Sequence, residues 1–217
     1  MNRLALLLLL ALAVSIISFG CSNEIEKIYD DPYLDSLAAI RHDIRSGDNP
    51  FVTLETNFGK MTFELFRDIA PAHADSFLAR TEDGFYDSTI FHRVVENFMI
   101  QGGNPIPVGK KMVEYQLDAE FNDLPHEDGT LSMARARSEN SAGTQFFVCL
   151  GRNRSTEWLD GKYTNFGHLV RGYDVLHRIA KVPVVASEIM GGEVSWPTQQ
   201  VALIDAFVSD KDGSPLK

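Results

Sequence analysis

Apolar and polar residues alternate with a period of two at the start of the main folded part of this chain. Every second residue between Lys60 and Phe66 is apolar, namely Met61, Phe63 and Leu65. This period is typical of a strand with one buried face. A second apolar segment, residues 51–56, precedes it, and only residues 57–59 separate the two. The pattern predicts a β-hairpin whose apolar face must be covered by another element.

Two segments instead have the spacing of amphipathic helices. The first follows Pro71, a residue suited to a first helical turn, and is expected to end by Gly84. Its apolar stripe consists of Ala70, Ala74, Phe77 and Leu78. The second runs from Tyr173 to Ala180 and is expected to bury Val175, Leu176 and Ile179.

Short extended segments make up most of the remaining pattern. The candidate strands are Leu131–Ala134, Gln145–Leu150, Asn165–Val170 and Val201–Val208. Many strands with only two helices favour a closed barrel or a sandwich capped by helices. The sequence therefore predicts one mainly β domain over residues 51–210, followed by a tail of residues 211–217.

The N-terminal segment has the layout of a secretory signal peptide. A short start with Arg3 precedes an apolar run, Leu4–Ser18, and Gly20 and Cys21 follow. The run is too short for a transmembrane helix, which needs about 20 apolar residues. The junction at Cys21 resembles a bacterial lipoprotein signal, although an aliphatic residue is preferred where Ser18 stands. The resemblance implies cleavage after residues 1–20 and lipidation of Cys21, and an ordinary secreted protein is the alternative.

Residues 21–50 are predicted to form a tether between the lipid and the domain. Residues 22–31 are polar and acidic, as in a solvated spacer. Residues 32–45 have apolar positions at helical spacing and predict a short amphipathic helix. Residues 46–50 contain Gly and Pro and end it.

Charge and cysteine content limit the partners. The chain has 20 Lys and Arg against 30 Asp and Glu, a formal charge of −10. This balance disfavours nucleic-acid binding and gives no polybasic attraction to a membrane. Cys21 and Cys149 are the two cysteines, so lipidation of the first leaves no intramolecular disulfide. Cys149 lies in an apolar run and is expected to be a small buried residue.

The segment from Phe91 to Gly103 (FHRVVENFMIQGG) carries the candidate chemistry. It places one permanent cation, Arg93, and one amide side chain, Gln101, among large apolar residues. Two glycines close the segment, which we predict to be one short extended run. This composition is typical of a polar contact point inside an apolar cleft.

This segment resembles the signature of the cyclophilins, which are peptidyl-prolyl cis-trans isomerases. Further segments match cyclophilin segments in the same order and at suitable spacing: Leu131–Ala136 (LSMARA), Gly143–Phe147 (GTQFF), Glu157–Lys162 (EWLDGK) and Phe166-Gly167. The resemblance covers nearly all of residues 51–210. It implies a closed eight-stranded antiparallel barrel with a helix over each open end.

The resemblance also implies the roles of individual residues. Arg93 would be the principal catalytic residue, since its guanidinium stays protonated and can donate to the prolyl nitrogen of a twisted peptide bond. Phe98, Met99, Phe147 and Leu159 would line the proline pocket, Ala134 and Gln145 would lie beside the peptide, and Gln101 would bind substrate and orient Arg93. No cofactor is needed for this reaction.

Neighbouring residues have structural interpretations instead. His92 is predicted to be a structural residue because isomerisation transfers no proton and the strand period points it away from Arg93. Phe91, Phe146 and Val148 are assigned to the core by the same alternation. Four other histidines, His73, His126, His168 and His177, lack the spacing of zinc ligands, so no metal site is predicted.

The chain departs from common cyclophilins at three places. Arg135 stands where many members have Asn, Tyr163 replaces a frequent His at the pocket rim, and residues 138–144 form a loop one residue longer than in common eukaryotic members. Trp158 matches the tryptophan of cyclosporin-sensitive members, so we expect the drug to bind.

Two functions follow from these features. The first is a prolyl isomerase, expected to be a monomer, that acts on proline-containing segments of exported client proteins. It would be held by lipid in a bacterial envelope, facing the periplasm, with the outer membrane favoured because Ser22 is not acidic. The second is a non-catalytic, lipid-tethered peptide-binding or chaperone module. Intact Arg93 favours the enzyme, because a binding module could lose it and keep its pocket.

Overall fold

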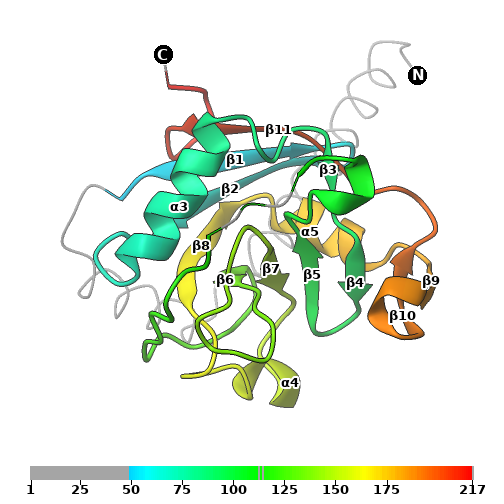
Figure 1. Cartoon of the computed structure of the whole chain (residues 1–217). Helices are drawn as coiled ribbons and strands as arrows, with labels where there is room; N and C mark the ends of the chain where they lie inside the picture. Colours follow the sequence, from blue (N-terminus) through cyan, green and yellow to red (C-terminus); the bar gives the residue numbers. More distant parts are fainter. Residues whose placement is uncertain (1–48, 112, 114, 217) are drawn as a thin grey trace, which may run out of the picture. The chain divides into compact units, whose positions relative to one another are not determined.

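The computed structural model describes residues 49–111, 113 and 115–216 (Figure 1). The expected signal peptide, the lipidation site at Cys21 and the tether helix over residues 32–45 lie outside these residues. Among the described residues, no helix has the length and apolar character needed to cross a lipid bilayer. The described residues belong to one compact unit, Gly47–Lys217.

One curled antiparallel sheet of nine strands forms the centre of this unit (Figure 1). Along the sheet the strands follow the order β3-β11-β1-β2-β8-β6-β7-β5-β4. Their bounds are β1 Phe51–Thr56, β2 Gly59–Leu65, β3 Thr89–Ile90, β4 Arg93–Val95, β5 Met99–Gly102, β6 Thr130–Met133, β7 Phe146–Cys149, β8 Asn165–Arg171 and β11 Ala202–Ser209. A separate two-stranded ribbon consists of β9 (Val184–Ser187) and β10 (Glu193–Pro197).

Two helices cover the sheet, as the sequence predicts. α3 (Pro71–Glu82) packs against β8 and β11, and α5 (Tyr173–Ala180) packs against β2, β4 and β5 (Figure 1). The expected apolar face of α5, formed by Val175, Leu176 and Ile179, is buried. Three single-turn helices, α4 (Arg154–Glu157), η1 (Ile106–Val108) and η2 (Glu188–Met190), were not predicted.

The expectation of a closed eight-stranded barrel is wrong in strand number and in closure. The end strands of the sheet are β3 and β4, which are not hydrogen-bonded to each other. They are consecutive in the chain and joined by Phe91 and His92. The Phe91 N–H donates to the Val201 carbonyl (2.9 Å), and the His92 N–H donates to the Gln101 carbonyl (3.0 Å). The chain thus changes its pairing partner within two residues, so covalent continuity links the two edges.

The predicted hairpin of β1 and β2 is confirmed. It pairs Val52 with Phe63 and Leu54 with Met61, and all four side chains are buried. The core behind it is rich in aromatic residues, because α3 adds Phe77 to the rings carried by the strands. Phe146 meets Phe77 and Phe91 edge to face, with ring centroids 5.2 and 5.8 Å apart. The core assignment of Phe91, Phe146 and Val148 is therefore confirmed.

The segment from Phe91 to Gly103 is a hairpin and not one extended run. β4 and β5 are joined by a tight turn in which Asn97 has a φ of 60°. Asparagine tolerates this left-handed conformation better than most residues. The register pairs Arg93 with Gln101 and Val95 with Met99. The turn thus brings Arg93 and Gln101 side by side, although eight positions separate them in the sequence.

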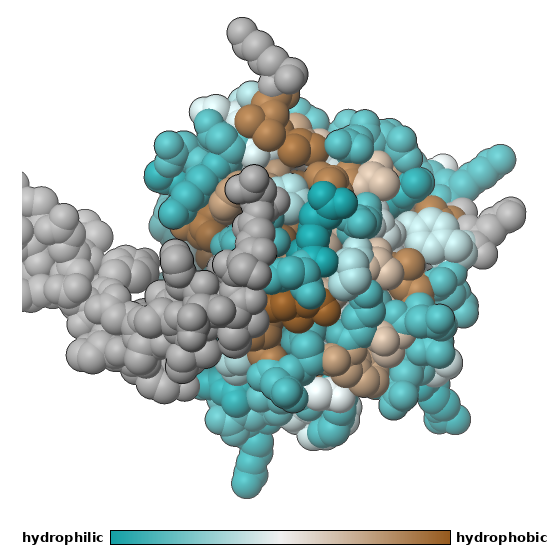
Figure 2. Space-filling view, turned by 90° about the vertical axis from the view of Figure 1, so that its left-hand side faces the viewer, coloured by the Kyte–Doolittle hydropathy of each residue, from teal (hydrophilic) through white to brown (hydrophobic). Residues whose placement is uncertain are grey.

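The surface is mixed in polarity. Hydrophilic side chains cover much of the face seen in Figure 2, with smaller groups of apolar residues between them. On the ribbon of β9 and β10, the apolar side chains of Val185, Ile189 and Val194 are exposed. An amphipathic pattern cannot identify such short strands, because Val185 and Val194 are exposed while polar Ser187 and Ser195 are buried.

Candidate active site

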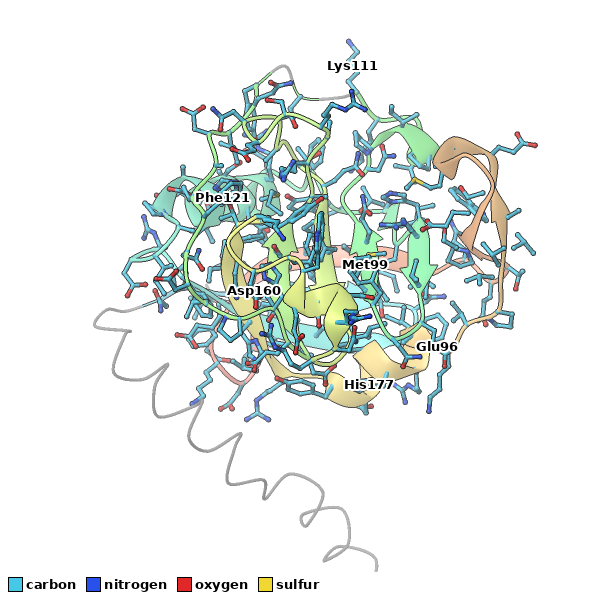
Figure 3. All side chains as sticks on the ribbon, turned by 90° about the horizontal axis from the view of Figure 1, so that it is seen from below. Glu96, Met99, Lys111, Phe121, Asp160 and His177 are labelled. Atoms are coloured by element: carbon cyan, nitrogen blue, oxygen red, sulfur yellow. The ribbon has the colours of Figure 1, made fainter. Side chains whose placement is uncertain are left out.

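The sequence-predicted site residues gather around one cavity of about 250 Å³. β4, β5 and β7 form one side of it, and the segment after α4 forms another. Its lining consists of Arg93, Phe98, Met99, Gln101, Ala134, Arg135, Phe147, Trp158, Leu159, Tyr163 and Met190. Figure 3 labels Met99 near the centre of the view from below. Gln145 is the one predicted site residue that does not line this cavity.

The cavity has an apolar floor that is distinct from the main core. Met99, Phe147, Cys149 and Leu159 are buried together, each with at most 4% of its surface exposed. The Tyr163 ring packs edge to face on Phe147, with centroids 5.8 Å apart. Burial raises the pKa of the Cys149 thiol, which therefore stays protonated. The expectation that Cys149 is a small buried residue is confirmed.

Arg93 brings a positive charge to the edge of the cavity. In β4 its neighbour Val94 points into the core with 1% exposed, so the Arg93 side chain lies on the opposite face, where it is 18% exposed. Its Nη1 donates to Gln101 Oε1 at 3.2 Å. Gln101 Nε2 in turn donates to Gln145 Oε1 at 3.0 Å. Gln145 thus joins the site through Gln101, and both residues line an adjoining depression of about 360 Å³.

Sequence reasoning missed Glu193 and Met190. Glu193 Oε2 accepts from Arg93 Nε at 2.6 Å, and Glu193 Oε1 accepts from Arg93 Nη2 at 2.8 Å. This contact with Arg93 lowers the pKa of the Glu193 carboxyl, so both partners are charged at neutral pH. Both missed residues come from the ribbon region between α5 and β11, where the sequence predicts no element. No signal in the pattern of residues could have found them.

The rim of the cavity is formed by stacked aromatic and cationic groups. The Arg135 guanidinium lies 4.6 Å from the centroid of the Tyr163 ring, and its Nε and Nη2 donate to the Lys162 carbonyl. Lys162 Nζ lies 4.5 Å from the centroid of the Trp158 ring. Trp158 itself is 57% exposed. Much of its indole ring is therefore accessible from solvent.

A polar network supports the floor from behind. The His126 ring stacks on Phe147 at a centroid distance of 6.2 Å and lies 2.9 Å from the Ser132 hydroxyl through Nε2. Its Nδ1 lies 3.1 Å from Asp160, which also pairs with Arg152 at 2.7 Å. Burial lowers the pKa of His126, against the opposing effect of Asp160. The network holds the orientation of Phe147 without placing an ionisable group in the cavity.

His92 is buried beside the site, as predicted for a structural residue. Only 1% of it is exposed. Burial lowers the pKa of its imidazole to about 4, with a further contribution from the Arg93 charge and an opposing one from the Ile90 backbone. His92 is therefore neutral at physiological pH.

Comparison with known proteins identifies the family. Residues 51–207 match the family model described as cyclophilin type peptidyl-prolyl cis-trans isomerase/CLD. The chain belongs to the cyclophilin family. It is 40% identical over 137 residues to the peptidyl-prolyl cis-trans isomerase-like 1 of Neurospora crassa, covering 61% of this chain and 82% of that protein. It is 36% identical over 164 residues to a peptidyl-prolyl cis-trans isomerase of Acinetobacter baylyi, covering 74% and 86%.

A solved structure supports the same assignment. A cyclophilin-type isomerase of Cryptosporidium parvum, crystallised in the presence of the dipeptide Ala-Pro, matches with a TM-score of 0.65 and 31% identity. The match covers 74% of this chain and 99% of that one. The cyclophilin fold and the isomerase activity expected from the sequence are thereby confirmed.

Proposed function

We propose that this cyclophilin isomerises X-Pro bonds of exported proteins and that the cavity beside Arg93 is its active site. The observation that carries this proposal is the position of the Arg93 guanidinium at the edge of a pocket whose floor is Met99, Phe147 and Leu159. An apolar pocket suits a proline ring, and a neighbouring cation suits the developing lone pair on the prolyl nitrogen.

The mechanism follows from the nature of the barrier. Rotation about an X-Pro bond costs about 18 to 20 kcal/mol because it breaks amide resonance. In the twisted state the prolyl nitrogen regains its lone pair and can accept a hydrogen bond. Arg93 Nη1, the guanidinium nitrogen that contacts the cavity residues Gln101 and Met99, is the proposed donor. This donation lowers the barrier because it is stronger in the twisted state than in the planar one.

The surrounding side chains make that contact effective. Phe98, Phe147 and Leu159 exclude water from the pocket, and a lower dielectric strengthens the pull of a cation on a lone pair. Gln101 accepts from Arg93 Nη1 and so limits rotation of the guanidinium. Ala134 and Gln145, which are joined by a backbone hydrogen bond, are proposed to lie beside the peptide. Arg135 is proposed to act through its backbone, since its guanidinium is held by Tyr163 and Lys162.

Measured turnover by the full-length protein tests this function. Wild type should accelerate exchange of an Ala-Pro tetrapeptide, and Arg93→Ala should lose about 100-fold or more, the cost of removing one transition-state hydrogen-bond donor. Arg171→Ala is the matched control, because Arg171 also pairs with a carboxylate, Asp212, but lies outside the cavity. Activity of Arg93→Ala equal to that of the control would reject the assignment of Arg93.

The alternative that the sequence left open, a non-catalytic peptide-binding module, is disfavoured by the family match. Measurements on the wild-type protein test this alternative. A folded wild type that binds Ala-Pro peptides without accelerating their cis-trans exchange would support the module. Cyclosporin is a further proposed ligand, because the exposed indole of Trp158 stands at the rim of the cavity. Undiminished turnover in excess cyclosporin would reject that proposal.

A further inference from the structure

The guanidinium of Arg93 has two differently occupied edges. The edge formed by Nε and Nη2 is taken up by both oxygens of Glu193, at 2.6 and 2.8 Å. On the other side Nη1 contacts Gln101 Oε1 at 3.2 Å and the Met99 sulfur at 3.9 Å, both from cavity-lining residues. The carboxylate thus engages the guanidinium on the edge away from Nη1.

Glu193 is held in place by the ribbon to which it belongs. It is the first residue of β10 and pairs with Ser187 of β9. β10 packs along β4, the strand that carries Arg93 (Figure 1). Ser187, which pairs with Glu193, and Ser195, two positions further along β10, are both buried with at most 2% exposed. The same ribbon region adds Met190 to the cavity lining.

From this geometry we infer that Glu193 is a positioning residue, which fixes the guanidinium plane of Arg93 so that Nη1 faces the proline pocket. The inference rests on the proposed catalytic role of Arg93. An arginine side chain has many rotamers, so fixing its guanidinium costs conformational entropy. A two-point contact removes that freedom before substrate binds, because a bidentate pair fixes direction as well as distance. Nη1 is left to Gln101 and the substrate.

The opposite interpretation is that Glu193 inhibits Arg93 and so lowers the activity. The Glu193 carboxylate would weaken the attraction between the Arg93 guanidinium and a lone pair of the substrate. A substrate would then have to displace this carboxylate. The geometry favours positioning, since Glu193 bonds Nε and Nη2 and leaves Nη1 to the cavity residues. The two interpretations predict opposite effects when the carboxylate is removed.

Glu193→Gln in the full-length protein separates them. Gln keeps the size of the side chain but offers one acceptor in place of two and removes the charge. We expect kcat for an Ala-Pro peptide, measured by NMR exchange spectroscopy, to fall about 10-fold with little change in KM. This loss is below the roughly 100-fold cost of a 1 Å misplacement at a reacting group. Glu188→Gln is the matched control, because it removes an exposed carboxylate from the same ribbon region.

Two further measurements distinguish positioning from a structural role. The Arg93 Nε–H resonance should be protected from exchange in wild type and in Glu188→Gln, and lost in Glu193→Gln. In an Arg93→Ala background, Glu193→Gln should have no additional effect on kcat. If Glu193→Gln does not fold, Glu193→Asp should give an intermediate kcat, since it keeps the charge but shortens its reach.

Each result decides the inference. Unchanged or raised kcat in Glu193→Gln would overturn the positioning role, and a raised kcat would establish the inhibitory role of Glu193. An equal loss of kcat in Glu188→Gln would also overturn it, because the effect would then belong to the charge of the ribbon. A wild-type protein without activity would instead reject the proposed function, which is a separate outcome.

Discussion

At the scale of single residues, the site depends on neighbours in sequence that have opposite environments. Val94 is buried in the core, whereas Arg93 lies half-buried at the cavity and His92 is enclosed with 1% exposed. Strand alternation explains why a cation that lines the cavity and core residues can be adjacent in the chain. The same alternation puts His92 on the buried face when Arg93 faces the cavity. Burial disfavours the protonated form of the His92 imidazole.

The low pKa of His92 predicts a pH-dependent stability. Its folded pKa is about 4, below the 6.5 of an exposed histidine. Between these values the unfolded chain binds more protons, so stability falls as pH drops from 7 toward 4. Going from pH 7 to pH 5 should cost about 2 kcal/mol of unfolding free energy from His92, at about 1.4 kcal/mol per pKa unit. Urea denaturation at the two pH values measures this loss.

Substitution of His92 isolates its share of the loss. His92→Phe should reduce the difference in unfolding free energy between pH 7 and pH 5, because the pKa of His92 is lowered by burial. The remaining difference in His92→Phe is expected to come from His73 and His126, whose pKa values are also lowered by burial. Equal pH dependence in wild type and His92→Phe would contradict the assignment.

At the scale of elements, close approaches of backbone decide where helices and strands meet. α5 begins after Gly172, which has a φ of 96° and lies against β2. A Cβ added at Gly172 would stand 2.3 Å from the Lys60 carbonyl oxygen. The position therefore requires glycine for two independent reasons, backbone conformation and space.

Gly172→Ala should therefore destabilise the protein strongly. We expect a loss of about 3 kcal/mol, from a left-handed conformation and from overpacking against β2. Gly151→Ala is the control, since Gly151 also has a positive φ (81°) but nothing lies within 4 Å of an added Cβ. It should lose only about 1 kcal/mol. Thermal or urea denaturation of both variants gives the comparison, and equal losses would show that space does not matter here.

The short elements mark the limit of prediction from pattern. The bounds of α5 follow from its apolar spacing, and the hairpin of β1 and β2 follows from its alternation. The turn at Asn97 was not predicted, because the three-residue loop 96–98 lacks the glycine that usually marks a short hairpin loop. The ribbon of β9 and β10 was not predicted either, because apolar Val185 and Val194 are exposed there while polar Ser187 and Ser195 are buried.

At the scale of the whole molecule, net charge bears on how the protein could attach to a membrane. The net charge of −10 gives no attraction to an anionic membrane surface. Attachment would therefore depend on the proposed lipid at Cys21. Stable anchoring needs more than one acyl chain or a second signal, because one chain alone binds only marginally.

Lipidation predicts a specific biochemical result. In a bacterium that processes lipoproteins, the full-length protein should incorporate labelled palmitate and fractionate with membranes. Cys21→Ser should lose the label and remain unanchored, whereas Cys149→Ser, a change at a buried thiol, should keep it. Absence of label in wild type would leave an ordinary secreted cyclophilin as the better description.

The sequence by itself determined the family, the two helices, the main hairpin and nearly all residues around the cavity. These features depend on local periodicity and on motifs whose members are close in the chain. Phe98, Met99 and Gln101 could be assigned because they stand in one segment with Arg93. Gln145 also belongs to the site, through its hydrogen bond to Gln101.

Only the tertiary structure decided the rest. The change of pairing partner at Phe91 and His92 depends on where β11 and β5 lie, so the sheet's end strands could not be counted from the sequence. The contact of Glu193 with Arg93 spans 100 positions and comes from a ribbon without a periodic signal. Such contacts are set by the packing of β10 against β4, because a long-range ion pair leaves no trace in the local pattern of apolar and polar residues.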